Sequence, residues 1–259
     1  MATLTDEQLR TWDHEGYLVP EEPLISPDTV HALQTFLDDV ATGRDAAFPP
    51  EKIVLQAKYT EQGITSTDLI GEERRLAVRL IETPHENSDV VNGVVHDPHI
   101  LDLVQDLIGP DIKLYATQVF AKPEGGTAEA WHQDSMSWTF FAPHNHVTIW
   151  IALDDATQEN GALNYIPGSH RYGYVVREKI PELVSQLEAD SVVIPRPAGH
   201  AAVHHTLLLH KTGPNTTTAP RRGMAMHFIR SDTRYLGDPS GRHLAPFPLL
   251  RGREISGRV

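Results

Sequence analysis

The second half of the sequence is a series of short apolar segments, and this pattern limits the possible folds more than any other feature. Clusters of turn-forming residues separate the segments, such as Glu124-Gly125-Gly126 and Pro167-Gly168-Ser169. Short strands that alternate with turns are typical of an all-β sandwich or barrel. The predicted strands are residues 112–122, 147–154, 162–166, 191–194, 201–209 and 223–230.

The first 110 residues show helical patterns instead. Three helices are predicted to begin after the capping residues Thr5, Ser26 and Asp97, and the last of them ends at Gly109. Helices followed by strands indicate helices packed outside one antiparallel β core. We therefore expect a mainly β protein in which residues 1–259 form a single domain, with the β core at about 112–230.

Two stretches give few structural signals. Residues 41–70 are predicted to form a long irregular excursion with a strand at 53–55, and such loops often wall or cover a pocket. The tail from Ser231 is rich in Pro, Gly and Arg and is predicted to be irregular.

Charge and cysteine content exclude several classes of protein. The chain has 22 Lys and Arg against 35 Asp and Glu, a formal net charge of −13. Nucleic acids and anionic membranes require a basic surface, so neither is expected as the main partner. The chain has no cysteine, which excludes disulfides and thiolate chemistry and suits a reducing cytoplasm. The start of the chain lacks the features of a signal peptide, and we expect a cytoplasmic protein.

The segment Trp131-His132-Gln133-Asp134 carries the first sign of chemistry. In an extended segment, His132 and Asp134 point to the same side, and together they supply two thirds of the 2-His-1-carboxylate triad that binds non-haem Fe(II). A second apolar segment delivers His210 to a polar turn, which offers a third ligand. Arg221 begins the next segment and could bind a carboxylate through two hydrogen bonds. The alternative is a hydrogen-bonded pair of His132 and Asp134 at a strand end.

The chain resembles the phytanoyl-CoA dioxygenase-like family of Fe(II)/2-oxoglutarate oxygenases. The resemblance follows family order over most of the chain, through residues 5–19, 131–134, 148–155, 160–163, 166–171 and 210–221. It implies a double-stranded β-helix (jelly-roll) core, iron bound by His132, Asp134 and His210, and 2-oxoglutarate and O2 as co-substrates. Arg221 lies at the spacing after His210 where the family places its 2-oxoglutarate arginine.

The resemblance implies further contacts in the same pocket. Thr148 matches a hydroxyl contact to 2-oxoglutarate, and Gln118 and Trp138 match positions that line the pocket. Lys122 could match a lysine that some family members use, although the correspondence is loose. The residues expected to face the substrate are Gln56, Lys58, Ser137 and Phe140.

Other polar residues are expected to be structural. Neighbours on a strand face opposite sides, so Arg222 is expected to be a solvated charge if Arg221 faces the pocket. The histidines at 204 and 205 are possible ligands, but His205 lies an odd number of residues from His210. The His144 and His146 pair is expected at the surface, Asp154 and Asp155 at a strand end bonding backbone groups, and His170 and Arg171 bracing a turn.

The function implied is oxidation of a small molecule with release of succinate and CO2. Hydroxylation or oxidative cyclisation in specialised or antibiotic metabolism is expected, and the carboxylate of Asp134 disfavours halogenation, for which related enzymes have a small residue. The alternative function is a jelly-roll module that binds a small molecule without catalysis.

Overall fold

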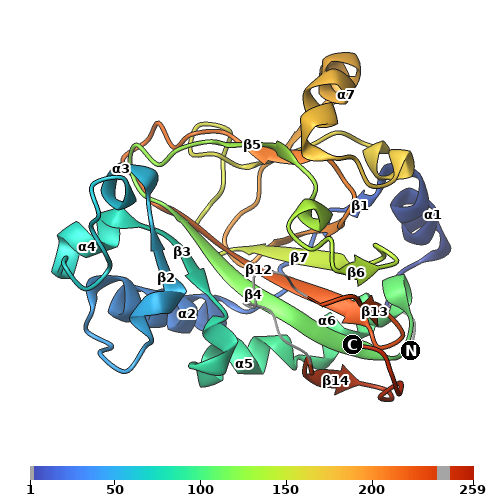
Figure 1. Ribbon diagram of the computed structural model, residues 1–259, viewed down its shortest axis with the longest axis horizontal. Coiled ribbons are helices and arrows are strands. Elements are labelled where there is room, and N and C mark those ends of the chain that lie inside the picture. The colour runs from blue at the N-terminus through green and yellow to red at the C-terminus, as the bar shows by residue number, and fades with distance from the viewer. Residues whose placement is uncertain (1–2, 238–245) are drawn as a thin grey trace.

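The computed structural model describes residues 3–237 and 246–259, and within this part of the chain two large antiparallel sheets face each other (Figure 1). The first sheet has eight strands, in the order β1 (Tyr17–Leu18), β10 (Ala201–His205), β7 (Val147–Ala152), β12 (Arg221–Arg230), β4 (Ile112–Lys122), β3 (Val78–Glu82) and β2 (Ile53–Leu55), with β14 (Leu249–Arg251) also paired to β4. The second sheet has the order β5 (Glu129–His132), β11 (His210–Thr212), β8 (Leu163–Tyr165) and β9 (Val192–Ile194). A short pair joins β6 (Phe141–Ala142) to β13 (Arg234–Tyr235). The predicted jelly-roll core is confirmed.

The α-helices of the described residues pack around the two sheets. They are α1 (Asp6–Glu15), α2 (Pro27–Thr42), α3 (Ala57–Thr60), α4 (Gly71–Ala77), α5 (Asp89–Val95), α6 (Pro98–Ile108) and α7 (Ile180–Leu187). Of these, α2, α5 and α6 lie against the sheet on the side away from β5, and α7 stands apart beyond the second sheet (Figure 1). The three predicted N-caps are confirmed, since the side chains of Thr5, Ser26 and Asp97 each accept a backbone N–H from the first turn of their helix.

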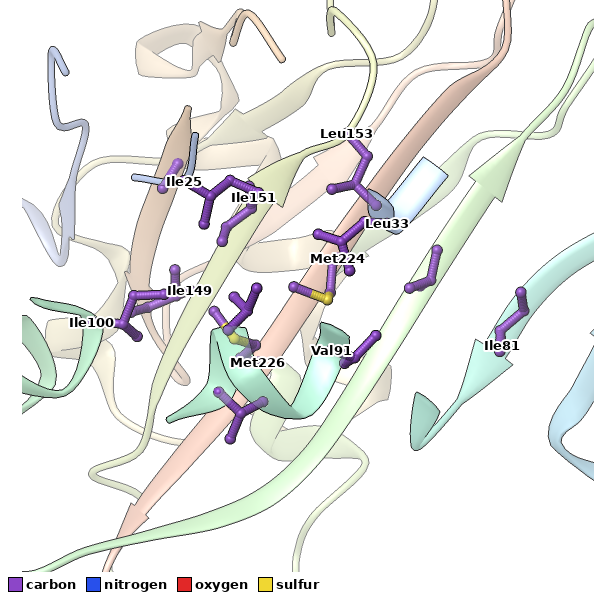
Figure 2. Packing of buried hydrophobic residues seen from close by; sticks show 14 of the residues in the cluster. Ile25, Leu33, Ile81, Val91, Ile100, Ile149, Ile151, Leu153, Met224 and Met226 are labelled. Atoms are coloured by element: carbon purple, nitrogen blue, oxygen red, sulfur yellow. The ribbon is translucent and has the colours of Figure 1, made fainter. Parts of the chain in front are cut away.

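The side chains of β7 and β12 alternate between two faces of the first sheet. One face packs against the helices, and the other faces the second sheet. Ile149 and Ile151 of β7 and Met224 and Met226 of β12 point toward the helices, where Leu33, Val91 and Ile100 pack against the sheet (Figure 2). Because successive residues of a strand face opposite sides, the residues between them face the second sheet. On that inner face lie Thr148, Trp150, Arg221, Ala225 and His227.

One predicted strand is wrong in its bounds. The run 201–209 was expected to be continuous, but β10 ends at His205 and β11 begins at His210 in the other sheet. A turn at residues 206–208 joins the two sheets. The corner is invisible in the sequence because its leucines are as apolar as a strand, and Leu208 and Leu209 are fully buried.

The remaining expectations hold in part. The predicted strand at 53–55 is β2, and β4 has the predicted bounds. The tail is not wholly irregular, since β13 and β14 both belong to it. The patterns did not predict α4, α5 or α7, which are eight residues or shorter. In the described residues, none of the helices has the length and apolar character needed to cross a membrane.

Candidate metal centre and co-substrate pocket

Two histidines and one carboxylate meet where the second sheet faces the first. His132 ends β5, His210 begins β11, and the two are direct cross-strand partners. Asp134 follows at the start of the 3₁₀ helix η3 (Asp134–Met136). One potential ligand atom from each of the three residues lies within 4.8 Å of the others, so the cluster can hold a metal ion. The predicted meeting of His132, Asp134 and His210 is therefore present in the structure.

Backbone carbonyls orient both imidazoles. The Nδ1 of His132 lies 2.8 Å from the carbonyl oxygen of Ala130, and the Nδ1 of His210 lies 3.0 Å from that of Leu208. A carbonyl only accepts, so each Nδ1 carries the hydrogen in these bonds. The lone pair of each neutral ring is then on Nε2, the atom available to a metal.

Protonation states also favour metal binding. Burial, with a smaller effect of His210, lowers the pKa of His132 to about 4, so that this ring is neutral near pH 7. Burial alone would raise the pKa of Asp134, but the nearby His210 and the hydrogen bond from His204 bring it well below its usual value. A neutral imidazole and an ionised carboxylate are the forms that ligate.

The two oxygens of Asp134 have different partners. Oδ1 lies 3.4 Å from Nε2 of His210, on the side of the cluster. Oδ2 accepts the hydroxyl of Thr148 at 2.7 Å and Nε2 of His204 at 3.1 Å. The hydroxyl of Tyr165 lies 2.9 Å from Nδ1 of His204 and, as the donor, selects the tautomer with hydrogen on Nε2. Asp134 is thus held so that one oxygen faces the metal position.

The polar side chains of the cavity wall extend this network. The Oγ1 of Thr148 also lies 2.9 Å from Nδ1 of His227, whose Nε2 lies 3.2 Å from Oε1 of Gln118. The indole of Trp138 lies edge-on to His227, with ring centroids 4.5 Å apart. Thr148, Gln118 and Trp138 all line the cavity, as expected. The hydroxyl of Thr148 is already bonded to Asp134, and its contact with 2-oxoglutarate stays a prediction.

Arg221 is a deeply buried charged residue in the wall of the cavity. The cavity has a volume of about 260 Å³ and extends from the metal cluster between the two sheets. Arg221 is 2 % exposed, its Nε has no hydrogen-bond partner, and it forms no ion pair with any described residue. Burial lowers its pKa to about 10, so it remains charged near pH 7. A buried guanidinium without a carboxylate fits an acidic ligand, and the donor set therefore fits 2-oxoglutarate.

Arg222 occupies the other face of the same strand, as the alternation predicted. Its guanidinium bonds both oxygens of Asp154, at 2.9 and 2.8 Å, and also bonds Asp38 at 2.9 Å. The expectation that Arg222 is a solvated charge is wrong. Its side chain is only 14% exposed, and its guanidinium is paired with these two carboxylates between α2 and the sheet. Asp154 is occupied by this pair, and Asp155 accepts the backbone N–H of Ala198.

Lys122 is a second buried cation of the cavity. It is the cross-strand partner of Arg221 and is 7 % exposed. Its ammonium donates to Oγ1 of Thr212 and to the carbonyl oxygen of Gly213, both neutral. Burial, and then the charge of Arg221, lowers its pKa to about 7. The loose match of Lys122 to a family lysine is consistent with this position, and strand alternation supports it, because Lys122 shares a face of β4 with Gln118.

The four residues expected to face the substrate divide into two pairs. Gln56 and Ser137 line the cavity. Lys58 is exposed and lies over the ring of Tyr59, and Phe140 is buried among the rings of a neighbouring aromatic cluster, so neither forms part of the wall. The sequence did not indicate Arg79, Glu129 and Arg177, which also line the cavity.

Two expectations about histidines need correction. His146 was expected at the surface but is fully buried, because its loop folds back against Phe141 and Trp138. Neither of its ring nitrogens has a hydrogen-bond partner among the described residues. The odd spacing of His205 from His210 has no meaning, since a turn separates their strands. His205 lies beside His170 and Trp12, away from the cluster.

The 2-oxoglutarate-dependent non-haem iron oxygenases combine two parts inside a jelly roll. One is a set of two histidines and one carboxylate that binds the iron, and the other is a cationic side chain that binds the dicarboxylate. The chain is an enzyme of this class, a dioxygenase whose cofactor is iron and whose co-substrates are 2-oxoglutarate and O2. Within the class, it belongs to the phytanoyl-CoA dioxygenase (PhyH) family, whose model matches residues 12–223.

Similar proteins show the range of the family. A probable alpha-ketoglutarate-dependent hypophosphite dioxygenase of Stutzerimonas stutzeri is 30% identical over 177 residues, which are 62% of this chain and 60% of that protein. A methylphosphonate hydroxylase of Gimesia maris is 28% identical over 88% of this chain and 81% of that protein. The crystal structure of EctD from S. alaskensis with bound Fe has a TM-score of 0.76 at 24% identity and covers all of this chain and 88% of its own.

Proposed function

We propose that His132, Asp134 and His210 bind the iron, that Arg221 binds the distal carboxylate of 2-oxoglutarate, and that the enzyme hydroxylates a small molecule. The observation that carries this proposal is Arg221, a buried and unpaired guanidinium that lines the same cavity as the three ligands. A buried charge without a partner costs several kcal/mol (~3–5) of stability, and a bound carboxylate supplies the missing partner.

The residues of the chain prepare the site for this chemistry. When bound, iron with 2-oxoglutarate and O2 supplies an oxidant that removes a hydrogen atom from a neighbouring carbon, with release of succinate and CO2. The backbone carbonyls at 130 and 208 keep Nε2 of both histidines free of hydrogen. Thr148 and His204 fix the carboxylate of Asp134. The buried wall of the cavity excludes water from the reacting carbon.

The size of the cavity supports a small substrate. Pockets for drug-sized ligands have volumes of roughly 300–1,000 Å³, whereas this cavity of about 260 Å³ must hold the co-substrate as well. Three similar proteins are named for small substrates: hypophosphite, methylphosphonate and L-proline. Two of these names are those of hydroxylases. Other similar proteins are named for phytanoyl-CoA, so the preference for a small substrate rests on the size of the cavity.

Oxidative cyclisation in specialised or antibiotic metabolism is the second candidate. The carbocyclase SnoK from nogalamycin biosynthesis has a TM-score of 0.71 at 20% identity and covers 95% of this chain. The same fold therefore supports ring closure, which begins with the same removal of hydrogen. The mass of the product distinguishes the two candidates, because hydroxylation adds one oxygen whereas ring closure removes two hydrogens.

Anaerobic titration with Fe(II) and 2-oxoglutarate tests the proposal. The expected result is a metal-to-ligand charge-transfer band in the wild-type protein that Asp134→Ala abolishes. Arg221→Gln should weaken 2-oxoglutarate binding and leave the affinity for Fe(II) unchanged. Arg222→Gln is the matched control, since it removes a guanidinium from the same strand on the opposite face. A wild-type protein that binds neither metal nor co-substrate would support the non-catalytic binding module instead.

A further inference from the structure

The charges of the cavity wall differ in sign from those of the whole chain. The formal net charge of the protein is −13. The wall of the cavity nevertheless contains three arginines, Arg79, Arg177 and Arg221, together with Lys122, whose pKa is about 7, against two carboxylates. Iron(II) and 2-oxoglutarate carry two charges each, of opposite sign, so loading the site leaves this local surplus of positive charge in place.

The four cations form two pairs that differ in depth. Arg221 and Lys122 are cross-strand partners at the inner end, 2 % and 7 % exposed. Arg177, at the start of the 3₁₀ helix η5 (Arg177–Lys179), is exposed, and the side chain of Arg79 on β3 is 42% exposed. The outer pair is therefore more accessible to a substrate in solution than the inner pair.

The two outer arginines are not equally occupied. Arg79 donates to the carboxylate of Glu129 on β5, and this ion pair joins the edges of the two sheets. The guanidinium of Arg177 forms neither an ion pair nor a hydrogen bond with any residue in the described ranges 3–237 and 246–259, and only its backbone carbonyl is bonded, by the N–H of Ile180. When 2-oxoglutarate is bound at Arg221, two guanidinium groups therefore remain in the more exposed part of the wall. That of Arg177 is free, and that of Arg79 shares the carboxylate of Glu129.

We propose that the substrate is a small acid, and that Arg177, assisted by Arg79, binds its carboxylate or phosphonate at the mouth of the cavity. This inference rests on the proposed function of the same cavity and adds the charge class of the substrate. Guanidinium groups bind both kinds of anion through paired hydrogen bonds. A recessed site of one sign also concentrates ligands of the opposite sign. Glu129 limits the affinity, because the substrate must compete with it for Arg79.

Two matched pairs of probes test the inference. Protein loaded anaerobically with Fe(II) and saturating 2-oxoglutarate is titrated at constant ionic strength with propionate or propionamide, and with methylphosphonate or its neutral dimethyl ester. Dissociation constants come from the change in the charge-transfer band, whose persistence shows that 2-oxoglutarate stays bound. The acid of at least one pair should bind about tenfold more tightly than its neutral partner, a typical effect of one charge-assisted hydrogen bond. The pair that responds identifies a carboxylate or a phosphonate substrate.

Variants assign the effect to the arginines. Arg177→Gln should remove most of the preference for the acid and leave the binding of the neutral probe unchanged. Glu129→Gln should tighten acid binding, because it frees Arg79. Lys179→Gln is the matched control. It also removes a positive charge, two residues further along the chain, but the side chain of Lys179 is exposed, pairs with Glu182 and lies outside the cavity.

The outcomes separate this inference from the proposed function. Equal binding of acids and neutral probes, an Arg177→Gln protein with unchanged preference, or a Glu129→Gln protein without tighter binding overturns the inference while the charge-transfer band is intact. Failure of the wild-type protein to form the band overturns the proposed function, and the inference with it.

Discussion

At the scale of single residues, the arrangement around Asp134 shows how neutral groups prepare a charged ligand. Thr148 and His204 both donate to Oδ2, and Tyr165 selects the tautomer of His204. Such supporting hydrogen bonds orient a ligand before the metal arrives. The role of Thr148 is therefore open to a direct test, because the resemblance to the family assigns this hydroxyl to 2-oxoglutarate instead.

Thr148→Val distinguishes the two roles. If the hydroxyl mainly orients Asp134, its removal should lower the affinity for Fe(II) by roughly 10–100-fold, as loss of a supporting group typically does. Calorimetry with and without 2-oxoglutarate measures both affinities. Thr212→Val removes a cavity hydroxyl that bonds Lys122 and should not change metal binding. A Thr148→Val protein that loses only affinity for 2-oxoglutarate would assign the hydroxyl to the co-substrate.

At the scale of elements, one glycine of β12 leaves room for a tryptophan side chain of β7. A Cβ added to Gly223 would lie 2.1 Å from Cζ2 of Trp150, whose indole forms the floor beneath Arg221. Trp150 is 4 % exposed, and an indole displaced by the added methyl group would move within the wall of the cavity. The glycine is required by this contact rather than by its backbone conformation.

Gly223→Ala should therefore destabilise the protein and disturb the anchor for 2-oxoglutarate. Inserting a methyl group into a packed core costs roughly 1–3 kcal/mol, and the displaced indole should weaken co-substrate binding. Thermal unfolding and anaerobic titration measure the two effects. Gly93→Ala serves as the control, since a Cβ at that helical position meets no atom within 4 Å. Equal stability of the two variants would show that Trp150 yields without cost.

The elements also show where sequence reasoning succeeds. The spacing implied by the resemblance correctly placed Arg221 in the cavity, and the alternation of side chains then placed Arg222 on the other face, because both lie on one regular strand. The same rule failed for His205 and His210, because an apolar run concealed a corner between two sheets. His146, Arg79 and Arg177 were missed for a related reason. Their positions depend on contacts with segments distant in sequence, which no local pattern records.

At the scale of the whole molecule, the fold buries several histidines as neutral rings. Burial lowers the pKa of His146 and of His205 to about 3, and that of His85 to about 4. In the unfolded chain these rings have a pKa of about 6.5. Between pH 6.5 and these lower values, the unfolded state binds more protons than the folded state. The free energy of unfolding therefore decreases as the pH falls through this range.

The apoprotein should lose stability steeply between pH 6.5 and pH 4. Each such histidine contributes up to about 1.4 kcal/mol per pH unit. Urea unfolding at a series of pH values measures the slope, and His146→Leu should make it shallower than in the wild type. His31→Leu, at an exposed position of α2, should leave the slope unchanged. Parallel slopes for all three proteins would contradict a neutral, buried His146.

Along β7 and β12, side chains that pack against the helices alternate with side chains that line the cavity. This alternation limits which changes of sequence the two strands can accept. Adding or deleting a single residue within either strand would reverse the direction of every side chain beyond it. In β12, a register shift of this kind would turn Arg221 toward the helices and bring Met224 into the site. We therefore expect these two strands to accept substitutions more readily than changes of length, which the loops that join the strands can absorb.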